Sequence, residues 1–302
     1  MDQIRGIYNI LTTPFQPDGS LDEPSLRRLT NAIIAMGVDG ITVLGVAGEA
    51  QKLTEPERAR VVATVMEVND GRVPIIVGAS RDGTSPAIAA CRAAQDAGAA
   101  GVMVAPPTLA QPGPALIEHF RRIGEAIDIP IVLQDYPPVN GVTLSPRAMA
   151  DLVEAVPAIT TIKLEDAPTP QRFAQTLALT GDRVSIVGGV GGMYLLDELR
   201  RGGSGAMTGF AFPEVLVTIW RAWERGDHKT AAETYYTYLP VLIFEGQPKV
   251  GVAIRKEVLR RRGLIDCARI RQPGLTLDDG TLAGLIATLE FTGIEQAFPA
   301  PI

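Results

Sequence analysis

The chain has 302 residues, 46% of them hydrophobic and 21% charged, and these values fit one large globular domain with a sizeable core. A formal net charge of −6 without a dense basic run excludes a nucleic-acid partner, and the absence of a long apolar stretch or signal peptide excludes a membrane partner. The two cysteines lie far apart and there are only two histidines, so we expect a reduced, cytoplasmic protein with no disulfide framework and no metal.

Eight short apolar runs recur along the chain, each rich in Val and Ile and bounded by Gly or Pro. Near-continuous hydrophobicity over such short lengths is typical of strands that are buried on both faces of a parallel sheet. We predict strands within residues 6–15, 40–45, 74–79, 101–106, 129–136, 160–165, 184–189 and 205–210.

Amphipathic segments separate these runs, and we predict helices over 21–37, 53–71, 84–99 and 145–156. The second helix begins with a capping box at Thr54 and Glu57, and the third has Ser85 as its expected N-cap. After the eighth strand, residues 213–245 are predicted to form a helix, a turn and a helix, followed by helices within 250–265 and 278–294. The basic stretch 255–263 looks like the solvent-facing side of a helix.

Eight strands with intervening crossovers predict an α/β fold, a (β/α)₈ TIM barrel over 1–224, with a C-terminal helical appendage over 225–302. A doubly wound open sheet is the alternative. It is less favoured because the first strand runs into "TTPFQPDG" rather than into a Gly-rich dinucleotide loop.

Lys163 is unusual among the five lysines, because it alone interrupts a predicted strand, in "TTIKLE". A buried ammonium is costly, so a lysine there is paired with a carboxylate, faces outward under a helix, or has a function. Burial also favours the neutral amine, which is nucleophilic toward a carbonyl. Strand alternation places Glu165 on the same face, where it forms a simple ion pair or moves protons during a reaction.

The C-terminal ends of the other strands hold the remaining candidates, because barrel active sites lie there. Tyr136 ends the fifth strand and is either a packing residue or a proton carrier. The loop Gly45, Val46, Ala47, Gly48 offers backbone N–H groups for a carboxylate. The other candidate substrate-binding residues, at the ends of the first, seventh and eighth strands, are Thr13, Gly189 and Met207.

These residues together resemble the dihydrodipicolinate synthase and N-acetylneuraminate lyase family of class I lyases. "TPF" after the first strand, the Gly-x-x-Gly-Glu loop, Tyr136 and "IK" ending in Lys163 occur in the family's order and spacing. The resemblance implies a Schiff base on Lys163, proton relay by Tyr136 and carboxylate binding by Gly45–Gly48. It also implies a homotetramer built as a dimer of dimers.

Three departures from the family pattern bear on the substrate. Val46 and Ala47 stand where the family usually has hydroxyl side chains. The segment "APPTLAQPGP" lacks the tyrosine, and "PPVNGV" lacks the arginine, of dihydrodipicolinate synthases. In contrast, "LQDYP", the Lys163–Glu165 pair and "GAMTG" resemble the branch that acts on 2-keto-3-deoxy sugar acids.

We therefore expect a Schiff-base lyase, a dehydratase or retro-aldolase of a 2-keto-3-deoxy sugar acid, that uses no cofactor. Dihydrodipicolinate synthase or N-acetylneuraminate lyase activity is one alternative. Others are a metal-assisted aldolase without an imine and a catalytically silent relative that binds a 2-oxo acid. Dehydration and retro-aldol cleavage both stay open at this point, since both pass through the same imine.

Overall fold

The fold is a closed barrel of eight parallel strands, seen here in a computed structural model that describes residues 3–301. The strand order is β7-β6-β5-β4-β3-β2-β1-β8, and backbone hydrogen bonds between β7 and β8, such as Met207 N to Gly188 O at 2.9 Å, close the barrel. The strands are β1 (Gly6–Ile10), β2 (Gly40–Val43), β3 (Ile75–Gly78), β4 (Gly101–Val104), β5 (Ile131–Asp135), β6 (Ile159–Leu164), β7 (Ser185–Val187) and β8 (Gly205–Thr208). The predicted TIM barrel is confirmed, and the open sheet is wrong.

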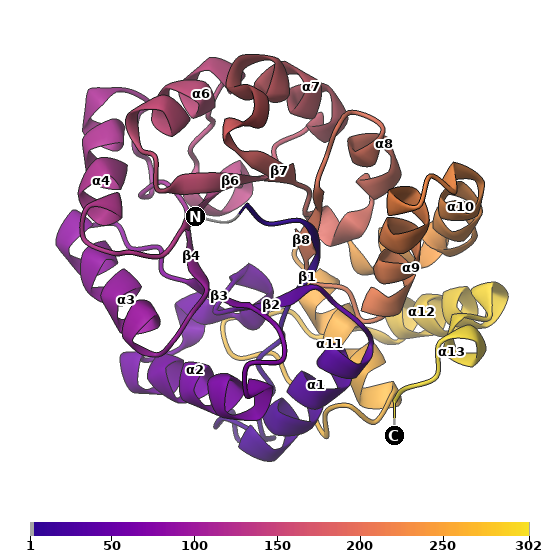
Figure 1. Cartoon of the computed structure of the whole chain (residues 1–302). Helices are drawn as coiled ribbons and strands as arrows, with labels where there is room; N and C mark the ends of the chain where they lie inside the picture. The colour runs from indigo at the N-terminus through magenta and orange to yellow at the C-terminus, as the bar shows by residue number, and fades with distance from the viewer. Residues whose placement is uncertain (1–2, 302) are drawn as a thin grey trace.

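Helices surround the strands as an outer ring (Figure 1). Those that alternate with the strands are α1 (Glu23–Ala35), α2 (Glu55–Asn69), α3 (Thr84–Asp96), α4 (Pro114–Gly124), α5 (Pro137–Asn140), α6 (Pro146–Ala155), α7 (Thr169–Thr180), α8 (Leu195–Leu199) and α9 (Pro213–Glu224). Short 3₁₀ turns lie at η1 (Val46–Gly48), η2 (Ala50–Lys52), η3 (Gly181–Arg183) and η4 (Val190–Gly192).

The ends of the elements follow local chemistry. The capping box of α2 is confirmed, with both the Thr54 and the Glu57 side chains bonded to backbone N–H groups. The expected cap of α3 is wrong: Gly83 is the N-cap, and Ser85 lies inside the first turn. The helix starts at Thr84, two residues earlier than a cap at Ser85 implies, because a proline anywhere in the first turn leaves no helical hydrogen bond unmade, so Pro86 does not fix the start.

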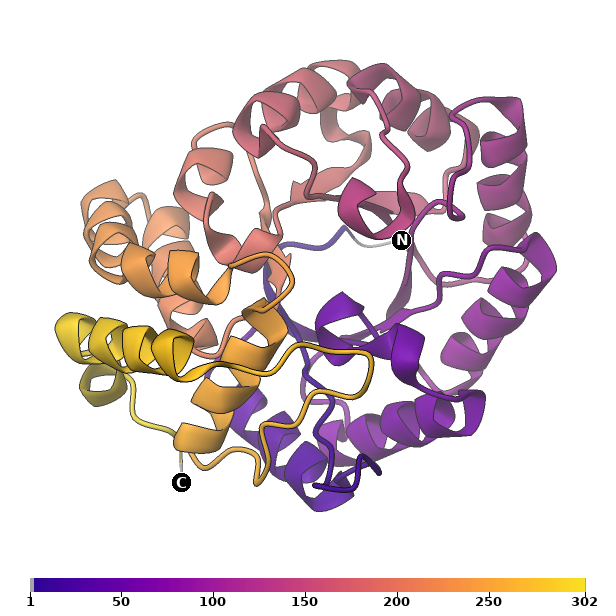
Figure 2. The ribbon, with the colours of Figure 1, turned by 180° about the vertical axis from the view of Figure 1, so that it is seen from behind.

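The C-terminal region adds α10 (His228–Glu245), α11 (Gly251–Arg261), α12 (Asp279–Thr292) and α13 (Ile294–Ala297). Helix α10 packs on α9, and α12 packs on α10. The boundary between 224 and 225 falls in the turn between α9 and α10, and the division into two folding units stays a prediction. Seen from behind, the segment between α11 and α12 reaches across to the turns that follow β2 (Figure 2). None of the helices within residues 3–301 is long and apolar enough to cross a membrane.

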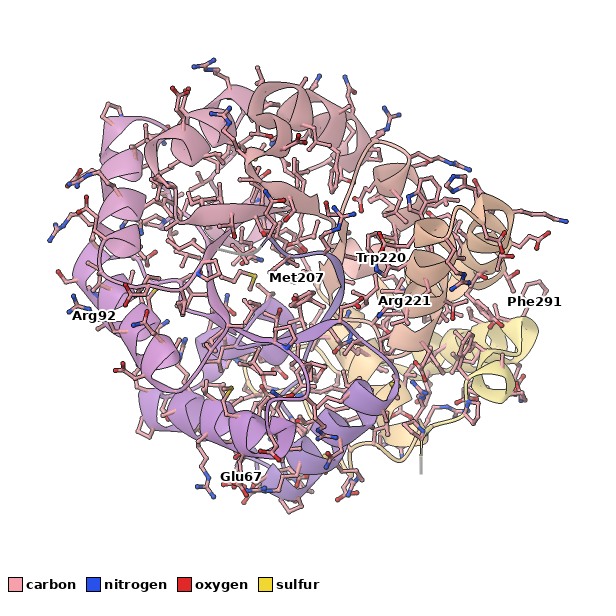
Figure 3. The ribbon with its side chains drawn as sticks, viewed as in Figure 1. Glu67, Arg92, Met207, Trp220, Arg221 and Phe291 are labelled. Atoms are coloured by element: carbon pink, nitrogen blue, oxygen red, sulfur yellow. The ribbon has the colours of Figure 1, made fainter. Side chains whose placement is uncertain are left out.

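The interior of the barrel is filled with apolar side chains below the strand ends. Met207 on β8 is fully buried and lies at the centre of the barrel in Figure 3. It packs in a cluster with Ile4, Tyr8, Ile10, Ala47, Ile76, Met103, Val132 and Val187. This layer forms a floor, above which polar side chains gather at the C-terminal ends of the strands.

Candidate active site

Lys163 lies on β6 opposite Gln134 of β5, and both side chains point into the barrel. Its side chain is only 2% exposed, and its ammonium forms an ion pair with Glu165. The neighbouring Asp135 points outward and pairs with Arg172 of α7 at 3.0 Å. Strand alternation therefore separates the inward candidate site residues from an outward ion pair.

Glu165 follows β6 and is held from three directions. Its Oε2 accepts from Lys163 and from Gln134 Nε2 at 3.1 Å, while its Oε1 accepts from the backbone N–H of Val190 at 3.2 Å. A Cβ on Gly189 would come within 2.2 Å of Glu165 Oε1, so glycine is required there to make room for the carboxylate. These contacts orient the carboxylate toward the Lys163 amine.

Tyr136 follows β5 directly and precedes α5, half-buried in the wall of the same cavity. Burial raises the pKa of its phenol, and the nearby Glu165 carboxylate raises it further, while Arg255 opposes the shift. The phenol is therefore protonated at neutral pH and available as a proton donor.

The loop after β2 turns sharply over the barrel. The non-glycine residues Leu44 (φ 58°) and Glu49 (φ 54°) flank it in the left-handed region, a strained conformation that surrounding contacts must hold. Thr13 does so by donating its hydroxyl to Gly48 O at 2.7 Å. The turn is closed by hydrogen bonds from Gly48 N to Gly45 O and from Glu49 N to Val46 O.

Val46 and Ala47 are the two loop residues that line the main cavity. Their backbone N–H groups have no hydrogen-bond acceptor among the residues that the structure describes. Their side chains carry no donor, so the two amide N–H groups are the hydrogen-bond donors that these residues have left for a ligand.

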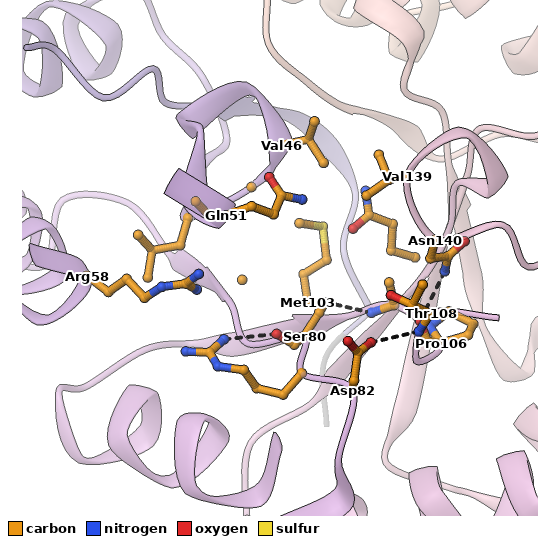
Figure 4. Close-up of a pocket in the computed structure, with 17 residues that line it drawn as sticks. Val46, Gln51, Arg58, Ser80, Asp82, Met103, Pro106, Thr108, Val139 and Asn140 are labelled. Atoms are coloured by element: carbon orange, nitrogen blue, oxygen red, sulfur yellow. Dashed lines mark hydrogen bonds between the residues drawn. The ribbon is translucent and has the colours of Figure 1, made fainter. Parts of the chain in front are cut away.

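The main cavity has a volume of about 770 Å³, which is ample for a small sugar acid. Barrel residues line its floor, and Gln247, Lys249, Arg255 and Leu275 of the C-terminal region line its roof. A side cavity of about 270 Å³ adjoins it and shares Val46, Gln51 and Gln134 with it. Figure 4 shows this side cavity extending from Val46 toward the Arg58 guanidinium.

The structure brings together Lys163, Glu165, Tyr136, Val46 and Ala47 around one cavity. The remaining predicted site residues do not line it. Thr13 and Gly189 support residues that do, Met207 lies below in the floor, and Gly45 and Gly48 form the ends of the turn.

Two buried cations, Arg255 and Lys256, were not predicted from the sequence, because both belong to the basic stretch 255–263. Its interpretation as a solvent-facing side is wrong at its start, because Arg255 is nearly buried in the cavity wall and Lys256 is fully buried. Arg255 lies four residues before Leu259, on the same buried face of α11. This helical spacing is the one sequence feature that could have indicated that Arg255 is buried. Buried carboxylates, Glu245 and Glu49, compensate the two charges.

No group of three or more His, Cys, Asp or Glu side chains within residues 3–301 is arranged to hold a metal ion. Most of the charged groups around the cavity form pairs: Lys163 with Glu165, Arg255 with Glu245, and Lys52 with Glu49. What this arrangement can do is to place a buried amine, a carboxylate and a phenol around one small organic ligand.

Comparison with known proteins supports the same chemistry. Residues 3–291 match the model of the dihydrodipicolinate synthetase family. The chain is 33% identical over 288 residues to an L-2-keto-3-deoxyarabonate dehydratase from Azospirillum brasilense, covering 94% of this chain and 93% of that relative. It is also 33% identical over 245 residues to a 4-hydroxy-tetrahydrodipicolinate synthase from Methanopyrus kandleri, covering 79% and 80%.

Solved structures share the fold over nearly the whole length. A dihydrodipicolinate synthase from Rhodopseudomonas palustris superposes with a TM-score of 0.89 at 35% identity, covering 95% of this chain and 97% of that one. A prophage protein of the same family from E. coli K12, solved in complex with pyruvate, gives a TM-score of 0.89 at 27% identity, covering 96% and 99%.

Proposed function

The chain belongs to the dihydrodipicolinate synthetase family of Schiff-base lyases, and within that family we propose that it removes water from a 2-keto-3-deoxy sugar acid. The observation that carries this proposal is the buried contact between the Lys163 ammonium and the Glu165 carboxylate. The contact places an acid/base group beside the carbon atoms that an imine on Lys163 would activate. The similarity to the Azospirillum dehydratase supports the same reaction.

The first step is attack of the neutral Lys163 amine on the C2 carbonyl of the substrate. The carbinolamine loses water and becomes a protonated imine, which withdraws electrons from C3. Glu165 accepts the ammonium proton through its contact with Lys163, and this proton is passed on to the departing C2 oxygen, to which Tyr136 donates. Glu165 is then a carboxylate again and takes a proton from C3. The resulting enamine expels the C4 hydroxyl, which leaves as water after Glu165 donates to it the proton taken from C3.

Tyr136 supplies the proton transfers around the carbinolamine. Its raised pKa keeps the phenol protonated, so it can donate to the departing C2 oxygen and recover the proton when the imine is hydrolysed. In this mechanism the backbone N–H groups of Val46 and Ala47 bind the substrate carboxylate.

The synthase reaction has less support, although several relatives carry that name. Thr108 and Leu109 occupy the loop after β4, and Val139 and Asn140 follow Tyr136. The Asn140 amide bonds to Pro106 O at 3.1 Å, so this segment is tied to the loop after β4. Neither segment presents a basic side chain for a second carboxylate.

Borohydride trapping tests the imine. The protein is incubated with pyruvate or with a 2-keto-3-deoxy pentonate, reduced, digested and analysed by mass spectrometry. We expect the adduct on the peptide that contains Lys163. We expect no adduct on the peptide that contains Lys249, a second lysine of the cavity, for which the described residues supply no ion pair. An adduct confined to Lys249, or none, contradicts the proposal.

Product analysis separates dehydration from carbon–carbon cleavage. We expect a dehydrated keto acid from the pentonate, with no free pyruvate. Release of pyruvate together with a short aldehyde would show a retro-aldolase instead. We further propose that the enzyme works as a homotetramer in the cytoplasm, as the family resemblance implies, and sedimentation analysis of the purified protein tests the assembly.

A further inference from the structure

The Arg255 guanidinium is a charged group in the wall of the main cavity that has no role in the mechanism above. Arg255 comes from α11, and its side chain is only 9% exposed. Its Nε donates to Glu245 Oε1 at 2.5 Å, and Glu245 Oε2 accepts from the backbone N–H of Ala211 at 3.0 Å. Both oxygens of the buried carboxylate are therefore used, and together they set the orientation of the guanidinium plane.

The free end of Arg255 lies at the end of β8, next to the loop that follows β2. A Cβ built on Gly209 would meet Arg255 Nη1 at 2.3 Å and the Ala47 Cβ at 3.1 Å. Gly209 is therefore the residue that lets the guanidinium approach Ala47. Arg255 also affects the pKa of Tyr136, which places its charge on the same side of the cavity as the phenol.

The guanidinium has five N–H donors, and the Nε–H is the one for which the described residues supply an acceptor. The N–H groups on Nη1 and Nη2 are left for a ligand in the cavity that Lys163 also lines. Val46 and Ala47 add two amide N–H groups but no hydroxyl. A planar fork of N–H donors beside these amides matches the two oxygens of a carboxylate.

We propose that Arg255 binds the C1 carboxylate of the 2-oxo acid, in a cradle completed by the backbone of Val46 and Ala47. The proposal rests on the proposed function, because it takes Lys163 as the group that holds C2. The C1 carboxylate is favoured over a distal substrate group since Arg255 lies against Ala47, whereas the side cavity extends away toward Arg58.

The test compares pyruvate with pyruvamide, its neutral analogue, by the concentration dependence of the borohydride-trapped adduct. In R255M we expect the half-saturating concentration of pyruvate to rise about 10- to 100-fold, the range for a hydrogen bond to a charged group, with that of pyruvamide unchanged within about twofold. R255K, which keeps the positive charge, should raise the half-saturating concentration of pyruvate less than R255M does. G209A should also raise the half-saturating concentration of pyruvate, because its methyl group displaces Nη1 of Arg255.

Arg260, exposed on the same helix, provides the control variant R260M, which should behave as the wild type. If R255M raised the half-saturating concentrations of pyruvate and pyruvamide equally, Arg255 would have a merely structural role, and the proposal would be overturned. Unchanged pyruvate with weaker binding of the pentonate would also overturn it, by placing Arg255 at the distal end of the substrate.

The two proposals fail in different ways. If the wild type forms no adduct with either ligand, the imine mechanism fails. Calorimetric titration of the wild type and R255M with pyruvate still measures the contribution of Arg255, because carboxylate binding does not require the imine. Equal pyruvate affinities in that titration would overturn the role of Arg255 alone.

Discussion

Glu49 and Lys256, 207 positions apart in the chain, form a buried ion pair of 2.5 Å that joins the turn after β2 to α11. The other oxygen of Glu49 accepts from Lys52 at 2.9 Å and from the backbone N–H of Arg271 at 3.0 Å. The ammonium of Lys256 lies over the Phe15 ring, 4.3 Å from its centroid. This cluster anchors the C-terminal segment beside the loop that lines the active site.

Removal of the Lys256 charge is expected to destabilise the protein. Burial lowers the pKa of Lys256 to about 8 while Glu49 opposes the shift, so at pH 7 the ammonium is present and paired. In Lys256→Met, Glu49 loses its closest buried partner, and the free energy of unfolding should fall by about 3 kcal/mol. Urea unfolding at pH 7 measures this. Lys229→Met, at an exposed site, is the control and should change it by less than about 0.5 kcal/mol.

Glu165→Gln separates imine formation from loss of water. The amide keeps the hydrogen bond to Val190 N but cannot take a proton from C3. We expect the borohydride adduct with pyruvate still to form on Lys163, although more slowly because the amide cannot accept the ammonium proton, while the rate of water loss falls about 100-fold or more. Rapid-quench product analysis measures both. A variant that dehydrates at the wild-type rate would remove Glu165 from the mechanism.

Tyr136→Phe is expected to slow formation and hydrolysis of the imine about 100-fold, because the phenol proton is lost. The pKa of Tyr136 is raised above its usual value of 10, mainly by burial, so the phenol is protonated throughout the range from pH 6 to 9. The activity of the wild type should therefore show no alkaline decline from this group in that range. The ratio of wild-type to variant kcat should stay constant from pH 6 to 9, and a ratio that collapses in this range would contradict the role.

Glu198 gives a pH-dependent contribution to stability. Burial raises its pKa to about 8, although the Thr169 hydroxyl donates to it at 2.6 Å. Between pH 4.5 and 8 the folded chain retains this proton and the unfolded chain does not, so the contribution to stability is lost as pH rises.

In Glu198→Gln the side chain at this position no longer titrates, but it keeps an oxygen that accepts the Thr169 hydroxyl. We expect its Tm, relative to that of the wild type, to increase steadily from pH 5 to 8. Calorimetry at four pH values checks the trend, with Glu154→Gln on the exposed side of α6 as the control. A constant difference in Tm would show that Glu198 does not change its protonation on unfolding.

Much of the fold and the heart of the candidate site could be predicted from the sequence, because they depend on local patterns. Short apolar runs separated by amphipathic segments are sufficient to indicate a barrel. Period-two alternation is sufficient to place Lys163 and Glu165 on one face and Tyr136 at the mouth.

The tertiary structure alone decided which residues complete the site. Arg255 and Lys256 belong to a helix whose composition indicates a solvent-facing side, and only the docking of α11 against the barrel buries them. Their partners Glu245 and Glu49 lie 10 and 207 positions away. The cost of burying a charge is offset only by a partner close in space, and no local pattern specifies one so distant in the chain. Sequence therefore determined the chemistry on each strand, and packing decided which distant charges surround it.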